Sequence, residues 1–79
     1  MNALRRTVEI IEDIIGNEIP SDVKFDKIRL IEDLGMDSLD IVELSLRLEE
    51  ELCFTGETND WEKWVTVRDV LAYVKAKKS

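Results

Sequence analysis

The stretch EDLGMDSLD, residues 32–40, runs directly into IVELSLRLEEEL, residues 41–52, and this junction decides the fold. Asp37 is a good N-cap, and Asp40 follows three residues later, where an acid suits the positive end of a helix dipole. Residues 41–52 are rich in Leu and Glu and contain neither Gly nor Pro, which favours a helix. The sequence therefore predicts its strongest helix over residues 37–52.

This predicted helix has two apolar stripes on a wheel of about 100° per residue. The first has the usual spacing of a core-facing stripe and contains Ile41, Leu44, Ser45, Leu48 and Leu52. The second is bordered by acids, with Leu39, Val42 and Leu46 in the stripe and Glu43, Glu49 and Glu50 beside it. Two interpretations fit: a helix buried on both sides, or an exposed strip for reversible protein contact.

Two further helices are predicted on either side. Apolar residues recur at helical spacing over residues 3–15, and Gly16 follows as a residue that tolerates a left-handed helix end. Thr66 and Asp69 form a capping-box-like pair that opens a last helix. Its predicted buried face consists of Val67, Val70, Leu71 and Val74. Residues 60–64 predict one short helical turn.

Residues 17–36 show no sustained period and predict a long loop with one helical turn. Scattered apolar residues predict that this loop is pinned to the core by Val23, Phe25, Ile28, Leu30, Ile31 and Leu34. A second loop is predicted where the central helix ends, at Thr55, Gly56, Thr58 and Asn59. The expected fold is all-α: a small antiparallel bundle of three main helices plus one short helix, with residues 1–79 as a single domain.

The charge is unevenly distributed. The chain carries a net charge of −7, and residues 31–62 hold eleven acidic residues against one basic residue, Arg47, which leaves +3 for the rest. Nucleic acid and anionic membrane both attract the opposite sign, so neither is an expected partner. Basic protein surfaces fit this charge, and so does a simple contribution to solubility.

Several site chemistries are excluded by composition. The chain has no histidine and one cysteine, Cys53, so it lacks Cys–His and Ser–His pairs and the common zinc sets. Asp33, Asp37 and Asp40 do not follow EF-hand spacing, because the third and sixth positions counted from Asp33 are Gly35 and Ser38. No catalytic or metal site is expected. Without a signal-like or membrane-spanning apolar run, a cytoplasmic monomer is predicted.

The string at residues 32–40, together with Val42-Glu43-Leu44 and residues 48–51, closely resembles the acyl carrier protein family. Similar features occur at residues 8–16 and 66–74, so the resemblance spans nearly the whole chain. It implies that Ser38 carries phosphopantetheine through a phosphodiester, installed from coenzyme A by a phosphopantetheinyl transferase. The arm ends in a thiol that holds acyl groups as thioesters, so the chain would be a carrier without catalytic residues.

The resemblance also implies partners with basic docking surfaces: the transferase, and the acyl-transferring and chain-elongating enzymes of fatty acid or polyketide synthesis. The expected contact face consists of Asp37, Leu39, Asp40, Val42, Glu43, Leu46, Glu49 and Glu50. An alternative is an unmodified acidic adaptor that binds basic proteins through the same helix. Residues 53–58 depart from the family's Glu-Ile-Pro-like stretch, and Trp61 and Trp64 are unusual for it; core packing is expected for both tryptophans.

Overall fold

The computed structural model describes residues 2–20, 22–55 and 60–78. In these residues the elements are α1 (Ala3–Ile15), η1 (Phe25–Lys27), α2 (Ser38–Leu52), η2 (Asp60–Lys63) and α3 (Val67–Lys78), where η denotes a short 3-10 helix. The predicted all-α class with three main helices is confirmed. The expected turn at 60–64 is η2, and the turn expected within the long loop is η1.

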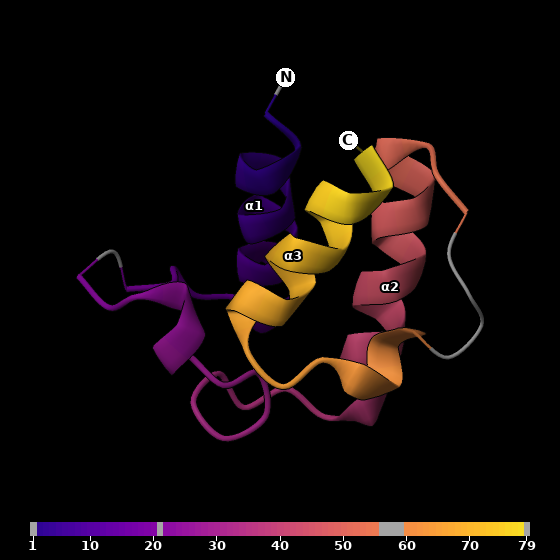
Figure 1. The fold of residues 1–79 in the computed structure, drawn as a ribbon. Coiled ribbons are helices and arrows are strands. Elements are labelled where there is room, and N and C mark those ends of the chain that lie inside the picture. Colours follow the sequence, from indigo (N-terminus) through magenta and orange to yellow (C-terminus); the bar gives the residue numbers. More distant parts are fainter. Residues whose placement is uncertain (1, 21, 56–59, 79) are drawn as a thin grey trace.

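The three main helices surround one core (Figure 1). α1 runs away from the N-terminal end of the molecule, and α2 and α3 run back toward it, so the two chain ends lie at the same end (Figure 1). α1 packs against both α2 and α3, while η1 packs against α3 and η2 against α2. The first residue of α2 therefore lies at the opposite end of the bundle from the termini.

Both ends of α2 have identifiable causes. The Asp40 backbone N–H donates to Asp37 Oδ1 at 2.9 Å, and the Asp37 N–H donates back to Asp40 Oδ2 at 3.2 Å, which completes the capping box. The helix ends at Leu52 because Cys53 adopts the left-handed conformation, with φ 58°. Of the loop residues predicted after this helix, Gly56, Thr58 and Asn59 lie outside the described residues.

The core contains the predicted stripes with some corrections. Ile41, Leu44, Leu48 and Leu52 of α2 are buried together with Val67, Val70 and Val74 of α3, whereas Ser45 and Leu71 are half-buried. α1 contributes Ile10 and Ile11, and also Thr7, which the apolar pattern missed. Thr7 is tolerated there because its hydroxyl donates to the Ala3 carbonyl at 2.7 Å.

The expectation that six apolar residues pin the long loop was wrong for three of them. Ile28 and Leu30 are buried and Leu34 is half-buried, but Val23, Phe25 and Ile31 are exposed. An antiparallel β-bridge between Arg29 and Thr66 explains part of this difference. Because alternate residues of an extended segment face the same side, Ile28 and Leu30 on either side of Arg29 both face the core, whereas Ile31 lies in the turn that follows and is exposed.

The start of α3 forms the predicted capping pair. Asp69 Oδ2 accepts the backbone N–H groups of Val65 at 2.9 Å and Thr66 at 3.0 Å, and the Asp69 N–H donates to Thr66 Oγ1 at 3.3 Å. The backbone hydrogen bond from Thr66 is the main cause that lowers the pKa of Asp69, and the bond from Val65 adds to it. This cap holds the segment that pairs with the long loop.

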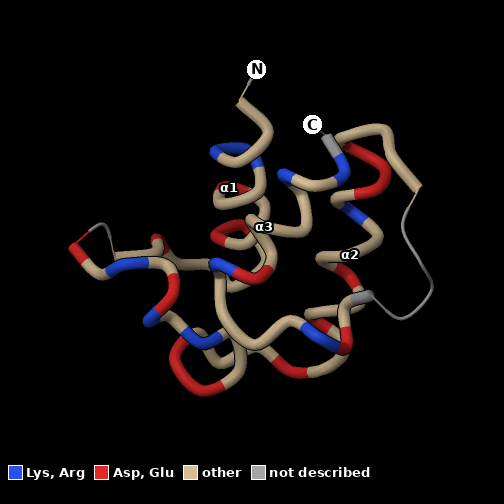
Figure 2. The backbone as a smooth tube through the Cα atoms, viewed as in Figure 1, with Lys and Arg blue, Asp and Glu red and all other residues tan. Residues whose placement is uncertain are grey.

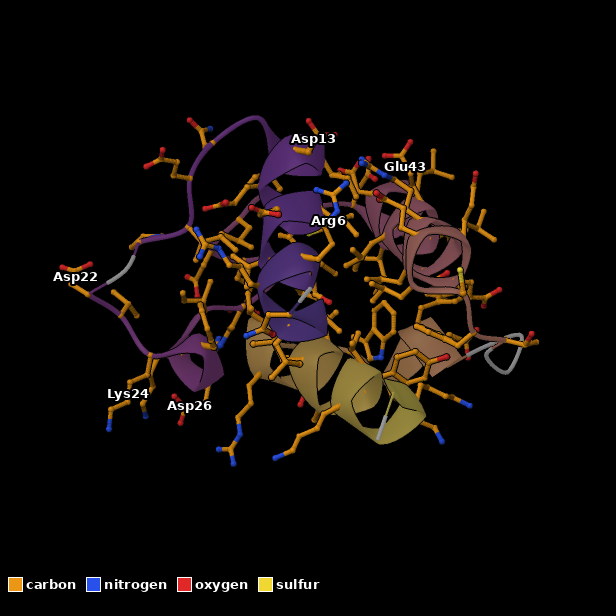
Figure 3. The ribbon with its side chains drawn as sticks, turned by 90° about the horizontal axis from the view of Figure 1, so that it is seen from above. Arg6, Asp13, Asp22, Lys24, Asp26 and Glu43 are labelled. Carbon is orange, nitrogen blue, oxygen red and sulfur yellow. The ribbon has the colours of Figure 1, made fainter. Side chains whose placement is uncertain are left out.

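Ion pairs connect α1 with α2. Arg6 pairs with Glu51, and Arg47 pairs with Asp13 at 2.9 Å and with Glu51 at 3.6 Å. Figure 3 shows Arg6 reaching from α1 toward α2. Such exposed pairs contribute little each, about 0.2–1 kcal/mol, but they neutralise Glu51 locally. The negative charge of Glu51 on α2 is therefore already paired with arginines of the same chain.

Candidate functional site

Ser38 is the first residue of α2 and its side chain is exposed. The Ser38 hydroxyl makes no hydrogen bond with any described residue, so it is accessible for chemistry. Ser45 differs, because its hydroxyl donates to the Val42 carbonyl at 2.9 Å within α2. Ser21 and Ser79 lie outside the described residues. Ser38 is thus the serine that the described residues leave exposed and unbonded.

The preceding loop sets the position of Ser38. The Arg29 N–H donates to Asp33 Oδ2 at 2.7 Å, and the Met36 N–H donates to the Leu30 carbonyl at 3.1 Å, so residues 29–36 fold back on themselves. Gly35 adopts a φ of 73°, and a Cβ there would meet no atom within 4 Å. Glycine is therefore favoured at this turn for its backbone conformation rather than for space.

Met36 anchors this loop next to the serine, and the motif analysis missed it. Its side chain is almost fully buried, one residue before the Asp37 cap. An apolar residue before the N-cap often packs against the fourth helical residue, which here is the buried Ile41. An apolar residue directly before the N-cap, followed by an apolar fourth helical residue, is the sequence signal that could have identified Met36. Met36 inside and Ser38 outside orient the start of α2.

The start of α2 suits a phosphate ester on Ser38. The capping box uses the N–H groups of Asp37 and Asp40, and within the described residues the N–H groups of Ser38 and Leu39 have no acceptor. Unpaired N–H groups and the positive end of the helix dipole both favour an anion at this position. An exposed hydroxyl beside two free donors therefore fits a phosphodiester.

The predicted contact face on α2 is open along its second stripe. Leu39 is 76% exposed and Leu46 is 59% exposed, whereas Val42 is half-buried. Glu43 and Glu50 are exposed and Glu49 is half-buried, and none of the three forms an ion pair with a described residue. Acidic residues follow α2 and the loop before it, while basic residues gather near the end of α3 (Figure 2). The interpretation of α2 as buried on both sides is wrong.

Aromatic packing lies near η2 and α3. Trp64 is buried and stacks edge-to-face on Tyr73, with ring centroids 5.1 Å apart, and Phe54 makes a similar contact with Tyr73 at 5.8 Å. Trp61 is half-buried against the same core. The expected packing role of both tryptophans is confirmed.

The described residues contain no group of three or more His, Cys, Asp or Glu side chains placed to hold a metal ion. No helix among them has the length and apolar character needed to cross a membrane.

Comparison with known proteins identifies the family. Residues 5–74 match the family model described as a phosphopantetheine attachment site. The chain is 37% identical over 70 residues to an acyl carrier protein of Campylobacter hominis, with 85% of this chain and 87% of that protein covered. It is 43% identical over 70 residues to an acyl carrier protein of Chlamydia trachomatis serovar D, with coverage of 89% and 88%.

A solved structure gives the same result. The fold matches the crystal structure of an acyl carrier protein from Thermotoga maritima with a TM-score of 0.73 and 25% identity, over 95% of this chain and 85% of that one. The chain therefore belongs to the phosphopantetheine attachment-site family, among its acyl carrier proteins.

Such carriers are not enzymes, and phosphopantetheine is their prosthetic group. Membership implies encounters with biosynthetic enzymes and with a phosphopantetheinyl transferase. The unmodified adaptor is not favoured.

Proposed function

We propose that Ser38 is the residue that carries the phosphopantetheine arm, and that the arm's thiol holds acyl intermediates of fatty acid or polyketide synthesis as thioesters. One observation carries the proposal: Ser38 is exposed at the first position of α2, with its hydroxyl unbonded among the described residues. In the modification, the Ser38 oxygen forms a new bond to phosphorus as the pyrophosphate bond of coenzyme A breaks. Adenosine bisphosphate leaves, and the hydroxyl proton passes to a base of the transferase or to water.

The serines provide a matched test. Ser38→Ala and Ser45→Ala each remove one hydroxyl from α2, and only Ser45 uses its hydroxyl in a helical hydrogen bond. After incubation with coenzyme A and a broad-specificity transferase, intact mass should show one added phosphopantetheine on the wild type and on Ser45→Ala, and none on Ser38→Ala. Mass gain by Ser38→Ala would contradict the assignment.

We propose that the acidic and the apolar residues on the contact face of α2 have different roles in partner binding. Glu43, Glu49 and Glu50 attract basic partner surfaces over long range, because no described ion pair uses their charges. Leu39, Val42 and Leu46 supply short-range apolar contact.

Asp37 and Asp40 also contribute charge to this face, although their carboxylates already close the capping box. Three expectations stay predictions: that the chain is a monomer, that it is cytoplasmic, and that residues 1–79 form a single domain. Sedimentation of the purified chain measures its oligomeric state.

A further inference from the structure

One peptide group connects the cap of α3 with the loop that precedes α2. The peptide group between Val65 and Thr66 carries the Thr66 N–H on one side and the Val65 carbonyl on the other. Its N–H donates to Asp69 Oδ2 at 3.0 Å, and its carbonyl accepts the Leu30 N–H at 2.9 Å. Because a peptide group is planar, the Asp69 carboxylate also fixes the direction in which the Val65 carbonyl points.

Leu30 extends this connection to the residues directly before Ser38. While the Leu30 N–H is bound to Val65, the Leu30 carbonyl accepts the Met36 N–H at 3.1 Å. Met36 is followed by Asp37, which caps α2, and then by Ser38. A chain of hydrogen bonds therefore runs from the carboxylate on α3 to the residue before the α2 cap.

Few backbone bonds tie this loop to the rest of the bundle. Among the described residues, two backbone hydrogen bonds join residues 28–36 to the second half of the chain. One is the bond from Leu30 to Val65, and the other runs from the Val67 N–H to the Ile28 carbonyl at 2.9 Å. Burial of apolar side chains also holds the loop on the core, but it is not directional, so these two bonds set how the loop is oriented.

The charge of Asp69 reaches the loop through this chain of bonds. A hydrogen bond to an ionised acceptor is stronger than one between neutral groups, and successive bonds in a chain strengthen one another. Asp69 Oδ2 accepts the N–H groups of both Val65 and Thr66, so two consecutive peptide groups are held by one carboxylate. Removal of the carboxylate should therefore weaken the bond to Leu30 as well as the cap of α3.

We propose that Asp69 is a positioning residue for Ser38: through the Val65–Thr66 peptide group it holds the loop that places Ser38 at the start of α2. The functional meaning of this inference rests on the proposed attachment at Ser38. Without the carboxylate, residues 29–36 should open locally while the three helices stay folded. Ser38 would then less often occupy the position that a phosphopantetheinyl transferase requires.

Amide hydrogen exchange, measured by NMR on the full unmodified chain, tests this positioning. In Asp69→Ala, exchange of the Leu30 and Met36 amides should accelerate about tenfold, as expected when a charged cap is lost from the state in which the loop is closed. Asp69→Asn keeps an acceptor oxygen without the charge, so its exchange rates should lie between those of wild type and Asp69→Ala. Exchange of the buried Leu48 amide on α2 records the overall stability of each variant.

Two other caps serve as matched controls. Thr66→Val removes the hydroxyl that accepts the Asp69 N–H at 3.3 Å but leaves the Asp69 carboxylate in place. Asn2→Ala removes the cap of α1, at the end of the bundle where both chain ends lie (Figure 1). Both controls should keep wild-type exchange at the two loop amides. Equal acceleration of those amides in either control would overturn the proposal, since it would show only a general loss of stability.

Modification kinetics connect the loop with Ser38. With coenzyme A and a phosphopantetheinyl transferase, Asp69→Ala should lower kcat roughly twofold or more and change KM little, because the contact face of α2 stays intact while the hydroxyl is less well placed. Wild-type exchange at Leu30 and Met36, or an unchanged kcat, would show that Asp69 only caps α3. A wild-type chain that gains no phosphopantetheine on Ser38 would instead refute the proposed function, and the exchange result would stand apart from that failure.

Discussion

Two leucines on α2 allow a comparison in which the substitution is the same and the environment differs. Leu48 is completely buried in the core, while Leu39 exposes 76% of its surface beside Ser38. Leu48→Ala should therefore lower the free energy of unfolding by about 2–5 kcal/mol, because the protein loses the free energy of burying the removed methyl and methylene groups and a cavity remains in the core. For a domain of this size, each kcal/mol lowers Tm by roughly 4–8 °C. Leu39→Ala should shift Tm by much less.

The effect on partner binding should be reversed. Full burial of a leucine contributes about 1.5–3 kcal/mol, and three quarters of the Leu39 surface remains available to a partner. Losing about 1–2 kcal/mol of this contact should lower kcat/KM roughly 5- to 30-fold. Steady-state assays with a phosphopantetheinyl transferase and an acyltransferase, combined with thermal unfolding of both variants, measure the two effects.

The reasoning would be refuted if Leu39→Ala lowered Tm as much as Leu48→Ala does, since Leu39 would then be part of the core. Unchanged kcat/KM with both enzymes would also refute it, because an exposed contact residue has no other described role. Val42→Ala should fall between the two variants, since Val42 is half-buried.

Two further predictions concern stability. Cys53→Gly should raise the free energy of unfolding by about 0.5–1 kcal/mol in urea titrations, because glycine adopts the left-handed φ of 58° without the strain of a side chain; a lower stability would contradict this. Asp69→Asn should lower stability by about 0.5–2 kcal/mol through loss of the charged cap on Thr66. Since folding lowers the Asp69 pKa below its ordinary 3.8, its contribution is complete above that value and is lost as the pH falls through the folded pKa. The difference between wild type and Asp69→Asn should shrink in acid, and a difference independent of pH would count against this cap.

Local features of the sequence predicted the helices well, because their causes are local. The Asp37 and Asp40 cap, the left-handed Gly16 and the Thr66 and Asp69 pair each act over about one helical turn, and all three are present in the structure. Attachment of the arm to Ser38 stays a prediction, implied by the family resemblance of residues 32–40, and the structure places Ser38 exposed at the first position of α2. Apolar spacing also separated Leu48 from Leu39 before any tertiary contact was known.

The long loop could not be resolved in the same way. Its six apolar residues share no period, so sequence alone gave no basis for separating buried Ile28 and Leu30 from exposed Ile31. That separation depends on pairing with residues 65–67, more than thirty positions away in the chain. Thus the sequence by itself determined the helices and their caps, because these depend on contacts within a turn. Only the tertiary structure decided which apolar residues of the loop are buried, because hydrogen bonds to residues 65–67, far away in the chain, hold Ile28 and Leu30 against the core.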